Sequence, residues 1–97
     1  MLARVVTVPV QGGKTELASG MVRESILLAM RNQPGFKGEL FLAQRDTGKA
    51  LSITLWETDT DLSHFEASPE YRELIGKLGA VLSGWPSGEL YEVGAQS

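Results

Sequence analysis

Strand-like and helix-like segments alternate along this chain in an order that limits its fold more than any other feature. Four strands are predicted from β-branched and alternating apolar residues, at 2–10, 37–45, 50–57 and 89–94. Helices are predicted from apolar residues spaced three and four positions apart, at 15–32, 58–67 and 68–82. The resulting β-α-β-β-α-β order is that of the ferredoxin-like, split β-α-β pattern. We therefore predict an α+β fold with a four-stranded antiparallel sheet, in a single domain that spans residues 1–97.

Turn and capping signals set the ends of these segments. Gly48 lies in the short link between the second and third strands, where a positive φ favours glycine, and predicts an antiparallel hairpin. Thr58 and Asp61 have the spacing of a capping box at the start of a short helix. Ser68 precedes Pro69, which predicts an N-cap followed by a proline at the first helical position.

The first predicted helix is amphipathic, and its apolar arc is expected to face the core. On a regular helical wheel, one broad arc holds Leu17, Ala18, Met21, Val22, Ser25, Ile26, Leu28, Ala29 and Met30. The opposite arc is polar except for Leu27, which is therefore expected to be exposed.

The predicted strands carry large apolar side chains on both faces of the sheet. Successive side chains of a strand point to opposite faces, so Leu40 and Leu42 lie opposite Phe41, and Ile53 lies opposite Trp56. The helices can cover only one face, and a second apolar face of this size is the mark of an interface. We therefore expect a second copy of the chain to cover it, which makes the protein a homodimer.

The composition excludes several classes of protein and site. Cysteine is absent, which excludes disulfides, thiol nucleophiles, zinc–thiolate sites and iron–sulfur clusters. A net charge of -3 without a basic run argues against a nucleic-acid partner. The longest apolar stretch, 26–30, is too short for a membrane span, and the N-terminus lacks a signal-peptide pattern, so we expect a cytoplasmic protein. No flavin, nicotinamide or metal motif is present, so no cofactor is expected.

Three runs of the sequence carry a family resemblance: Gln33-Pro34-Gly35-Phe36, the strand 51–57, and Ser68 to Tyr71. With them the chain resembles, over nearly its whole length, the antibiotic biosynthesis monooxygenase-like family of dimeric α+β barrels. The resemblance implies a ferredoxin-like protomer that pairs into a dimeric barrel. It also implies a cofactor-independent monooxygenase that acts on a small aromatic or quinol substrate. The alternative is a non-catalytic dimeric barrel that binds a small hydrophobic metabolite or serves only self-association.

One departure from the family concerns its histidine. Many members have a histidine nine residues after the tryptophan that corresponds to Trp56, where this chain has Phe65, with His64 one place earlier. On a helix this shift turns the imidazole by roughly 100°. The haem-degrading branch is not expected, because the positions of its asparagine, tryptophan and histidine hold Thr7, Phe65 and Ile75.

The candidate site combines His64 with an apolar pocket between the sheet and the helices. His64 is the only histidine and is the candidate catalytic base for a phenolic substrate; the alternative is a solvated histidine on a helix surface. The expected pocket lining is Val6, Val22, Ile26, Phe41, Trp56, Phe65, Tyr71 and Trp85. Trp56 and Tyr71 could instead be core residues, and Trp85 could dock its loop on a partner subunit. Few polar groups are expected near this pocket, which favours the non-catalytic alternatives.

Overall fold

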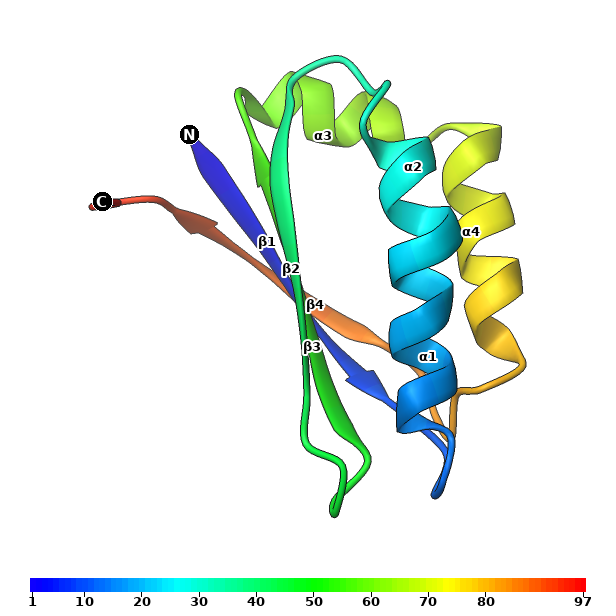
Figure 1. The fold of residues 1–97 in the computed structure, drawn as a ribbon. Coiled ribbons are helices and arrows are strands. Elements are labelled where there is room, and N and C mark those ends of the chain that lie inside the picture. The colour runs from blue at the N-terminus through cyan, green and yellow to red at the C-terminus, as the bar shows by residue number, and fades with distance from the viewer.

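The computed structural model describes all 97 residues, and its elements follow the predicted order (Figure 1). The strands are β1 (Leu2–Pro9), β2 (Phe36–Ala43), β3 (Lys49–Trp56) and β4 (Ser87–Glu92). The helical elements are α1 (Thr15–Met21), the π-helical turn η1 (Val22–Ile26), α2 (Leu27–Met30), α3 (Asp59–Glu66) and α4 (Pro69–Gly79). The strands form one antiparallel sheet in the order β2-β3-β1-β4. The predicted ferredoxin-like α+β fold is therefore confirmed.

The helices all lie on one face of the sheet, so the core forms between two layers (Figure 1). One core cluster gathers around the end of β3 and consists of Val22, Ile26, Met30, Trp56, Leu62, Phe65 and Leu74. A second cluster lies near the end of β1 and the start of β3, and consists of Val8, Val10, Ala18, Ala50 and Val81. Both clusters are made by alternate strand residues that meet the apolar faces of the helices, as period-two and period-3.6 patterns require.

The first helix departs from the regular wheel at its centre. The π turn at Val22–Ile26 contains one residue more than a regular turn, so each later residue takes the angular position that a regular helix gives to the residue before it. Leu27 therefore takes the inward place that a regular helix gives to Ile26, and it packs against the first core cluster. Leu28 takes the polar place predicted for Leu27 and is 55% exposed. The expected exposure of Leu27 is thus wrong, and so is the inward placement of Leu17, which lies at the edge of the predicted arc and is exposed.

The predicted turn and caps are confirmed. Gly48 has a φ of +71°, in the left-handed region that favours glycine. The Thr58 hydroxyl oxygen accepts the backbone N–H of Asp61 at 3.1 Å and donates to its carboxylate at 2.8 Å. The Ser68 hydroxyl oxygen accepts the backbone N–H of Tyr71 at 3.3 Å, directly before Pro69 at the start of α4.

Replacing Thr58 with alanine should lower the free energy of unfolding by about 1 kcal/mol, because it removes the N-cap of α3. Urea unfolding followed by circular dichroism measures this loss. Thr60→Ala is the matched control, since Thr60 is exposed within the same helix. An equal loss in both variants would contradict the role assigned to the cap.

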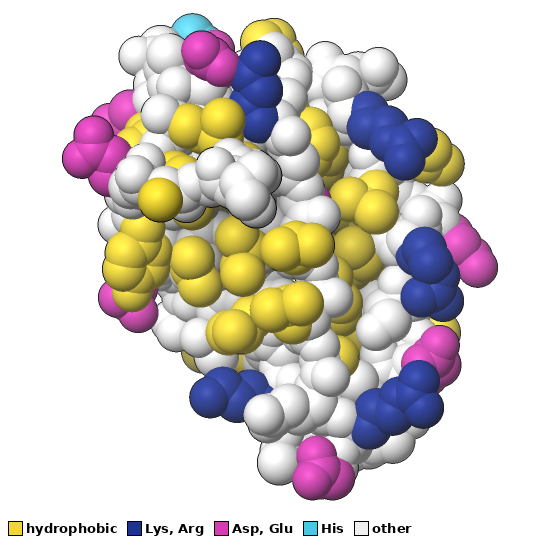
Figure 2. Space-filling view, turned by 60° about the vertical axis from the view of Figure 1, so that its left-hand side comes forward, with side chains coloured by type: hydrophobic (Ala, Val, Ile, Leu, Met, Phe, Trp, Pro, Cys, Tyr) yellow, Lys and Arg dark blue, Asp and Glu magenta, His cyan; other side chains and the backbone are white.

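The face of the sheet that points away from the helices is apolar in a single chain (Figure 2). The register places Leu40 beside Ile53 and Ile53 beside Val5, so these three side chains form one row across the sheet. Leu42 and Leu51 pair in the next row. Leu40 is 60% exposed, which is unusual for a leucine in the middle of a strand. We call the five residues of these two rows the outer-face patch.

None of the helices is long and apolar enough to cross a lipid bilayer.

Candidate functional site

A cavity of about 250 Å³ lies between the sheet and the helices. Its volume is larger than the ~150 Å³ of an apolar cavity known to take up benzene. Twenty residues line it, and fourteen of them are hydrophobic. Seven of the residues named from the sequence are among the twenty: Val6, Val22, Ile26, Phe41, Trp56, Phe65 and Tyr71. We call this space the sheet–helix cavity.

Trp85 does not line the sheet–helix cavity and has to be removed from the expected set. Its side chain is 94% exposed, whereas the next residue, Pro86, does line the cavity. The short connection between α4 and β4 turns Trp85 outward, and composition alone does not indicate which way such a loop residue points. The alternative reading, a contact of Trp85 with a partner subunit, stays a prediction.

His64 also lies outside the cavity. Helix α3 turns Leu62 and Phe65 toward the core, so that the two positions between them, Ser63 and His64, face solvent. The imidazole is exposed and is not among the lining residues. A single chain therefore gives no geometric support to His64 as the base, and its catalytic role stays a prediction.

Three aromatic rings of the cavity lining, those of Trp56, Phe65 and Tyr71, pack in a chain, and Phe36 supports them from outside the lining. Trp56 is fully buried; its ring stacks on Phe65 with centroids 5.2 Å apart and meets Phe36 edge-on at 5.6 Å. Phe65 in turn meets the ring of Tyr71 edge-on at 5.4 Å. The Trp56 indole N–H donates to the Thr54 hydroxyl at 2.9 Å, which fixes the orientation of the indole. A flat apolar ligand would meet a preformed aromatic wall here.

A short polar row crosses the otherwise apolar wall of the cavity. The register sets Glu39 beside Thr54 and Thr54 beside Arg4, so a polar row crosses three strands on the helix side of the sheet. Arg4 Nε lies 3.1 Å from Glu66 Oε2, and this ion pair links β1 to α3. The lining is mainly apolar, as expected, but the sequence alone did not show this polar row, because residues that are distant in the sequence become neighbours only through strand pairing.

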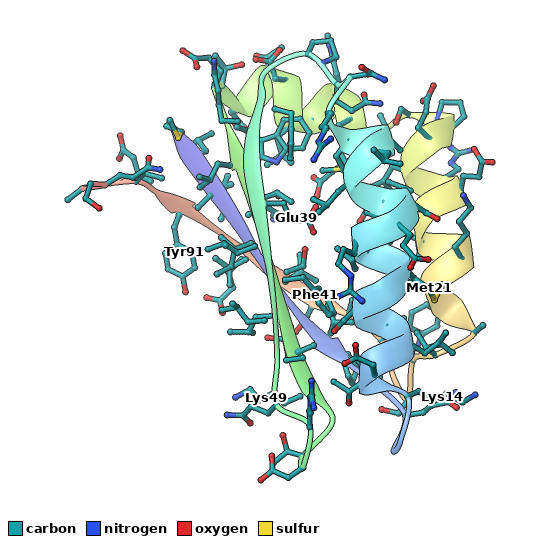
Figure 3. The ribbon with its side chains drawn as sticks, in the orientation of Figure 1. Lys14, Met21, Glu39, Phe41, Lys49 and Tyr91 are labelled. Atoms are coloured by element: carbon teal, nitrogen blue, oxygen red, sulfur yellow. The ribbon has the colours of Figure 1, made fainter.

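Glu39 is the polar residue that the sequence reasoning missed. Its side chain extends from β2 toward the helices, as does that of Phe41 (Figure 3). One carboxylate oxygen, Oε2, accepts a hydrogen bond from the Ser52 hydroxyl at 3.2 Å, while Oε1 is buried without a hydrogen-bond partner in the chain. Burial raises the pKa of Glu39, and the bond from Ser52 opposes part of that rise. Strand periodicity could have identified Glu39 as a cavity residue, because it lies two positions before Phe41 and so points to the same face of the sheet.

Tyr71 contributes a phenol to the same cavity. Burial raises the pKa of Tyr71, the negative charge of Glu66 raises it further, and Arg4 opposes both effects. The phenol therefore stays neutral at neutral pH and can donate a hydrogen bond. The cavity thus combines an aromatic wall, a neutral phenol and a partly buried carboxylate.

The comparisons with known proteins bear on this arrangement. No protein-family model matches the sequence, and no curated protein matches it. A monooxygenase from the gene ActVA-Orf6 of Streptomyces coelicolor, solved in complex with nanaomycin D, is similar over 99% of this chain and 90% of its own, with 26% identity and a TM-score of 0.84. SnoaB, a cofactor-independent oxygenase from Streptomyces nogalater, is similar over 98% and 94%, with 21% identity and a TM-score of 0.78.

A third structure agrees with these two. A Nitrosomonas europaea protein, assigned by name to the antibiotic biosynthesis monooxygenases, is similar over 98% of this chain and 100% of its own, with 18% identity and a TM-score of 0.79. The three similarities span the whole sheet and all the helices rather than a shared motif. They confirm the resemblance predicted from the sequence: this chain has the fold of the antibiotic biosynthesis monooxygenase-like proteins.

Proposed function

We propose that this protein is a cofactor-independent monooxygenase that acts on a small aromatic or quinol substrate held in the sheet–helix cavity. The observation that carries the proposal is the cavity itself, whose lining combines the stacked rings of Trp56 and Phe65 with the carboxylate of Glu39, one oxygen of which is buried. The similar S. nogalater structure is that of a cofactor-independent oxygenase, and the similar S. coelicolor structure is that of a monooxygenase. Both names support the same reaction class.

In this reaction the substrate supplies the electrons. Loss of a proton from an electron-rich phenol or quinol gives an aryloxide, which donates electrons to O₂ directly. For an anthrol, one oxygen atom of O₂ becomes a new ring carbonyl, and the other leaves as water with two hydrogens, one from the phenolic hydroxyl and one from the ring carbon that is oxidised. The protein's part is to exclude water, accept the proton and stabilise the developing oxyanion by hydrogen bonds.

We further propose that the working unit is a homodimer, joined through the outer-face patch. The patch is continuous across β2, β3 and β1 and lies on the side of the sheet opposite the cavity. Covering it with a second copy buries the apolar surface that a single chain leaves in water.

The second candidate function is non-catalytic binding of a small hydrophobic metabolite. It is favoured by the fourteen hydrophobic residues among the twenty that line the cavity, and by the position of the only histidine outside it. A protein that binds aromatic ligands without accelerating their oxidation would belong to this class.

Oxygen uptake with a panel of anthrols and naphthohydroquinones tests the proposal. We expect the wild-type protein to accelerate uptake above the spontaneous rate, with one O₂ consumed per substrate. Val6→Phe places a larger side chain in the cavity from a rigid strand and should raise KM about tenfold, the effect of roughly 1.4 kcal/mol of lost binding. Leu28→Phe is the control, because Leu28 is exposed and does not line the cavity.

The outcomes separate the candidate functions. Uptake no faster than the spontaneous rate, with ligand binding retained, would exclude catalysis and support the binding function. Equal activity of Val6→Phe and Leu28→Phe would show that turnover does not use this cavity.

A further inference from the structure

Of the two carboxylate oxygens of Glu39 in the sheet–helix cavity, one accepts a hydrogen bond from the chain and the other accepts none. Oε2 is held by the Ser52 hydroxyl at 3.2 Å, so the carboxylate has a fixed position. Oε1 is buried and accepts no hydrogen bond from the chain. Buried acceptors in folded proteins are almost always paired, and an unpaired one calls for an explanation. In a cavity the missing hydrogen bond comes from a donor that enters it, which is water when the site is empty and a hydroxyl of the ligand when the site is filled.

The other polar groups of the cavity are paired, neutral or, like Arg4, donors rather than acceptors. Among the charged lining residues, Arg4 of β1 and Glu66 of α3 form an ion pair with Nε and Oε2 3.1 Å apart, although the buried Arg4 Nε donates no well-oriented hydrogen bond within the chain. Thr54 of β3 accepts the hydrogen bond of the indole, and Tyr71 of α4 is a neutral phenol. The first helix lines the cavity only with apolar side chains, Val22, Ile26 and Met30. Glu39 Oε1 is therefore the one buried acceptor of the cavity lining that has no hydrogen-bond partner in the chain.

We propose that Glu39 Oε1 is the group that recognises a hydroxyl of the bound ligand, and that it takes the proton of that hydroxyl when the ligand is a phenol or hydroquinone. The second half rests on the proposed oxygenase function; the first half, recognition, does not. In the proton transfer the ligand O–H bond breaks, a new O–H bond forms at Oε1, and the electron pair stays on the ligand as an aryloxide. This step is an acid–base exchange and needs no oxidant.

The environment of Glu39 suits this role. Burial favours the protonated form of a carboxyl group, so it brings the pKa of Glu39 closer to that of an electron-rich phenol and eases the transfer. The same burial disfavours a second negative charge, so the cavity should reject carboxylate ligands. Ethers and quinones, which carry acceptors but no donor, would leave Oε1 unpaired and should bind more weakly.

Binding of naphthol and of methoxynaphthalene tests recognition, because in methoxynaphthalene a methyl group replaces the hydroxyl hydrogen and removes the donor. The protein carries Trp85→Phe, so that the remaining indole, Trp56 in the cavity wall, reports binding by fluorescence quenching. We expect naphthol to bind at least about tenfold more tightly, as for a hydrogen bond to a charged group. Glu39→Leu should abolish this preference. Leu28→Asn, a polarity change of similar size on an exposed residue, should leave it intact.

A second variant separates recognition from proton transfer. Glu39→Gln keeps an acceptor at this position but cannot act as a base, so it should bind naphthol within a few-fold of wild type and lose about 100-fold or more of the turnover. Ser52→Ala removes a hydrogen bond that lowers the pKa of Glu39, so it should move the rise of kcat/KM to higher pH. A purely structural role for Ser52 would not shift that profile.

Stability provides a readout that needs no ligand. Because the pKa of Glu39 is higher in the folded chain than in the unfolded one, the folded state binds more protons between these two values, and stability falls as pH rises through that window. Glu39→Gln should therefore raise the urea midpoint at neutral pH, and the difference should shrink at acidic pH.

The outcomes distinguish this proposal from the proposed function. A preference of wild type for naphthol over methoxynaphthalene that disappears in Glu39→Leu supports recognition by Glu39. If the wild-type protein shows this preference but no turnover, only the oxygenase function fails. Discrimination that persists in Glu39→Leu overturns the proposal. So does a wild-type protein that binds both ligands equally or binds neither.

Discussion

Replacing Trp56 with alanine should lower the free energy of unfolding by about 3–5 kcal/mol, the range for removing a large aromatic side chain from a core. Trp56 has no exposed surface and contacts Phe36 and Phe65 through its ring. Alanine would leave a void that joins the existing cavity, and it would remove the indole that donates to Thr54. A domain of this size has a total stability of roughly 5–15 kcal/mol, so the loss is a large part of the whole.

The measurement is urea unfolding at a matched protein concentration, followed by far-UV circular dichroism. Trp85→Ala is the matched control, because it removes the same side chain from a position that is 94% exposed. We expect the control to change stability by no more than about 0.5 kcal/mol. Similar losses in both variants would mean that Trp56 is not the centre of the core, or that Trp85 is buried against another molecule.

The order of elements could be predicted because it depends on local signals. Period-two strands, the caps at Thr58 and Ser68, and the turn at Gly48 are each determined by residues a few positions apart. The first helix shows where local reasoning fails. A single π turn rotates the last turn of that helix about its axis, so Leu27 and Leu28 exchange their expected environments, and a regular wheel has no means of showing this.

The candidate site could be predicted only in its apolar part. Residues such as Phe41 and Trp56 are placed by strand periodicity, which one strand reveals by itself. The polar row is different, because Glu39 and Arg4 come together only once β2, β3 and β1 are in register. Before that pairing is known, a lone histidine such as His64 is a more visible candidate than a glutamate in a strand.

The outer-face patch should make the protein a dimer in solution, and Leu40→Glu should convert it to a monomer. Leu40 lies in the edge strand β2, in one row with Ile53 and Val5. At 60% exposure in one chain, its replacement costs the folded monomer little. In a two-fold dimer the substitution appears twice and leaves two carboxylates buried without partners, so the dissociation constant should rise at least about 100-fold.

Light scattering coupled to size-exclusion chromatography measures the oligomeric state, because the chain has a mass of 10.5 kDa and the dimer has twice that mass. Leu28→Glu is the matched control: the same substitution, at 55% exposure, on the helical side of the molecule. We expect wild type and Leu28→Glu to keep the dimer mass at micromolar concentration, and Leu40→Glu to shift to the monomer mass with unchanged circular dichroism. A wild-type protein that runs as a monomer would leave the outer-face patch without its second copy, and the working unit would then be the single chain that contains the whole sheet–helix cavity.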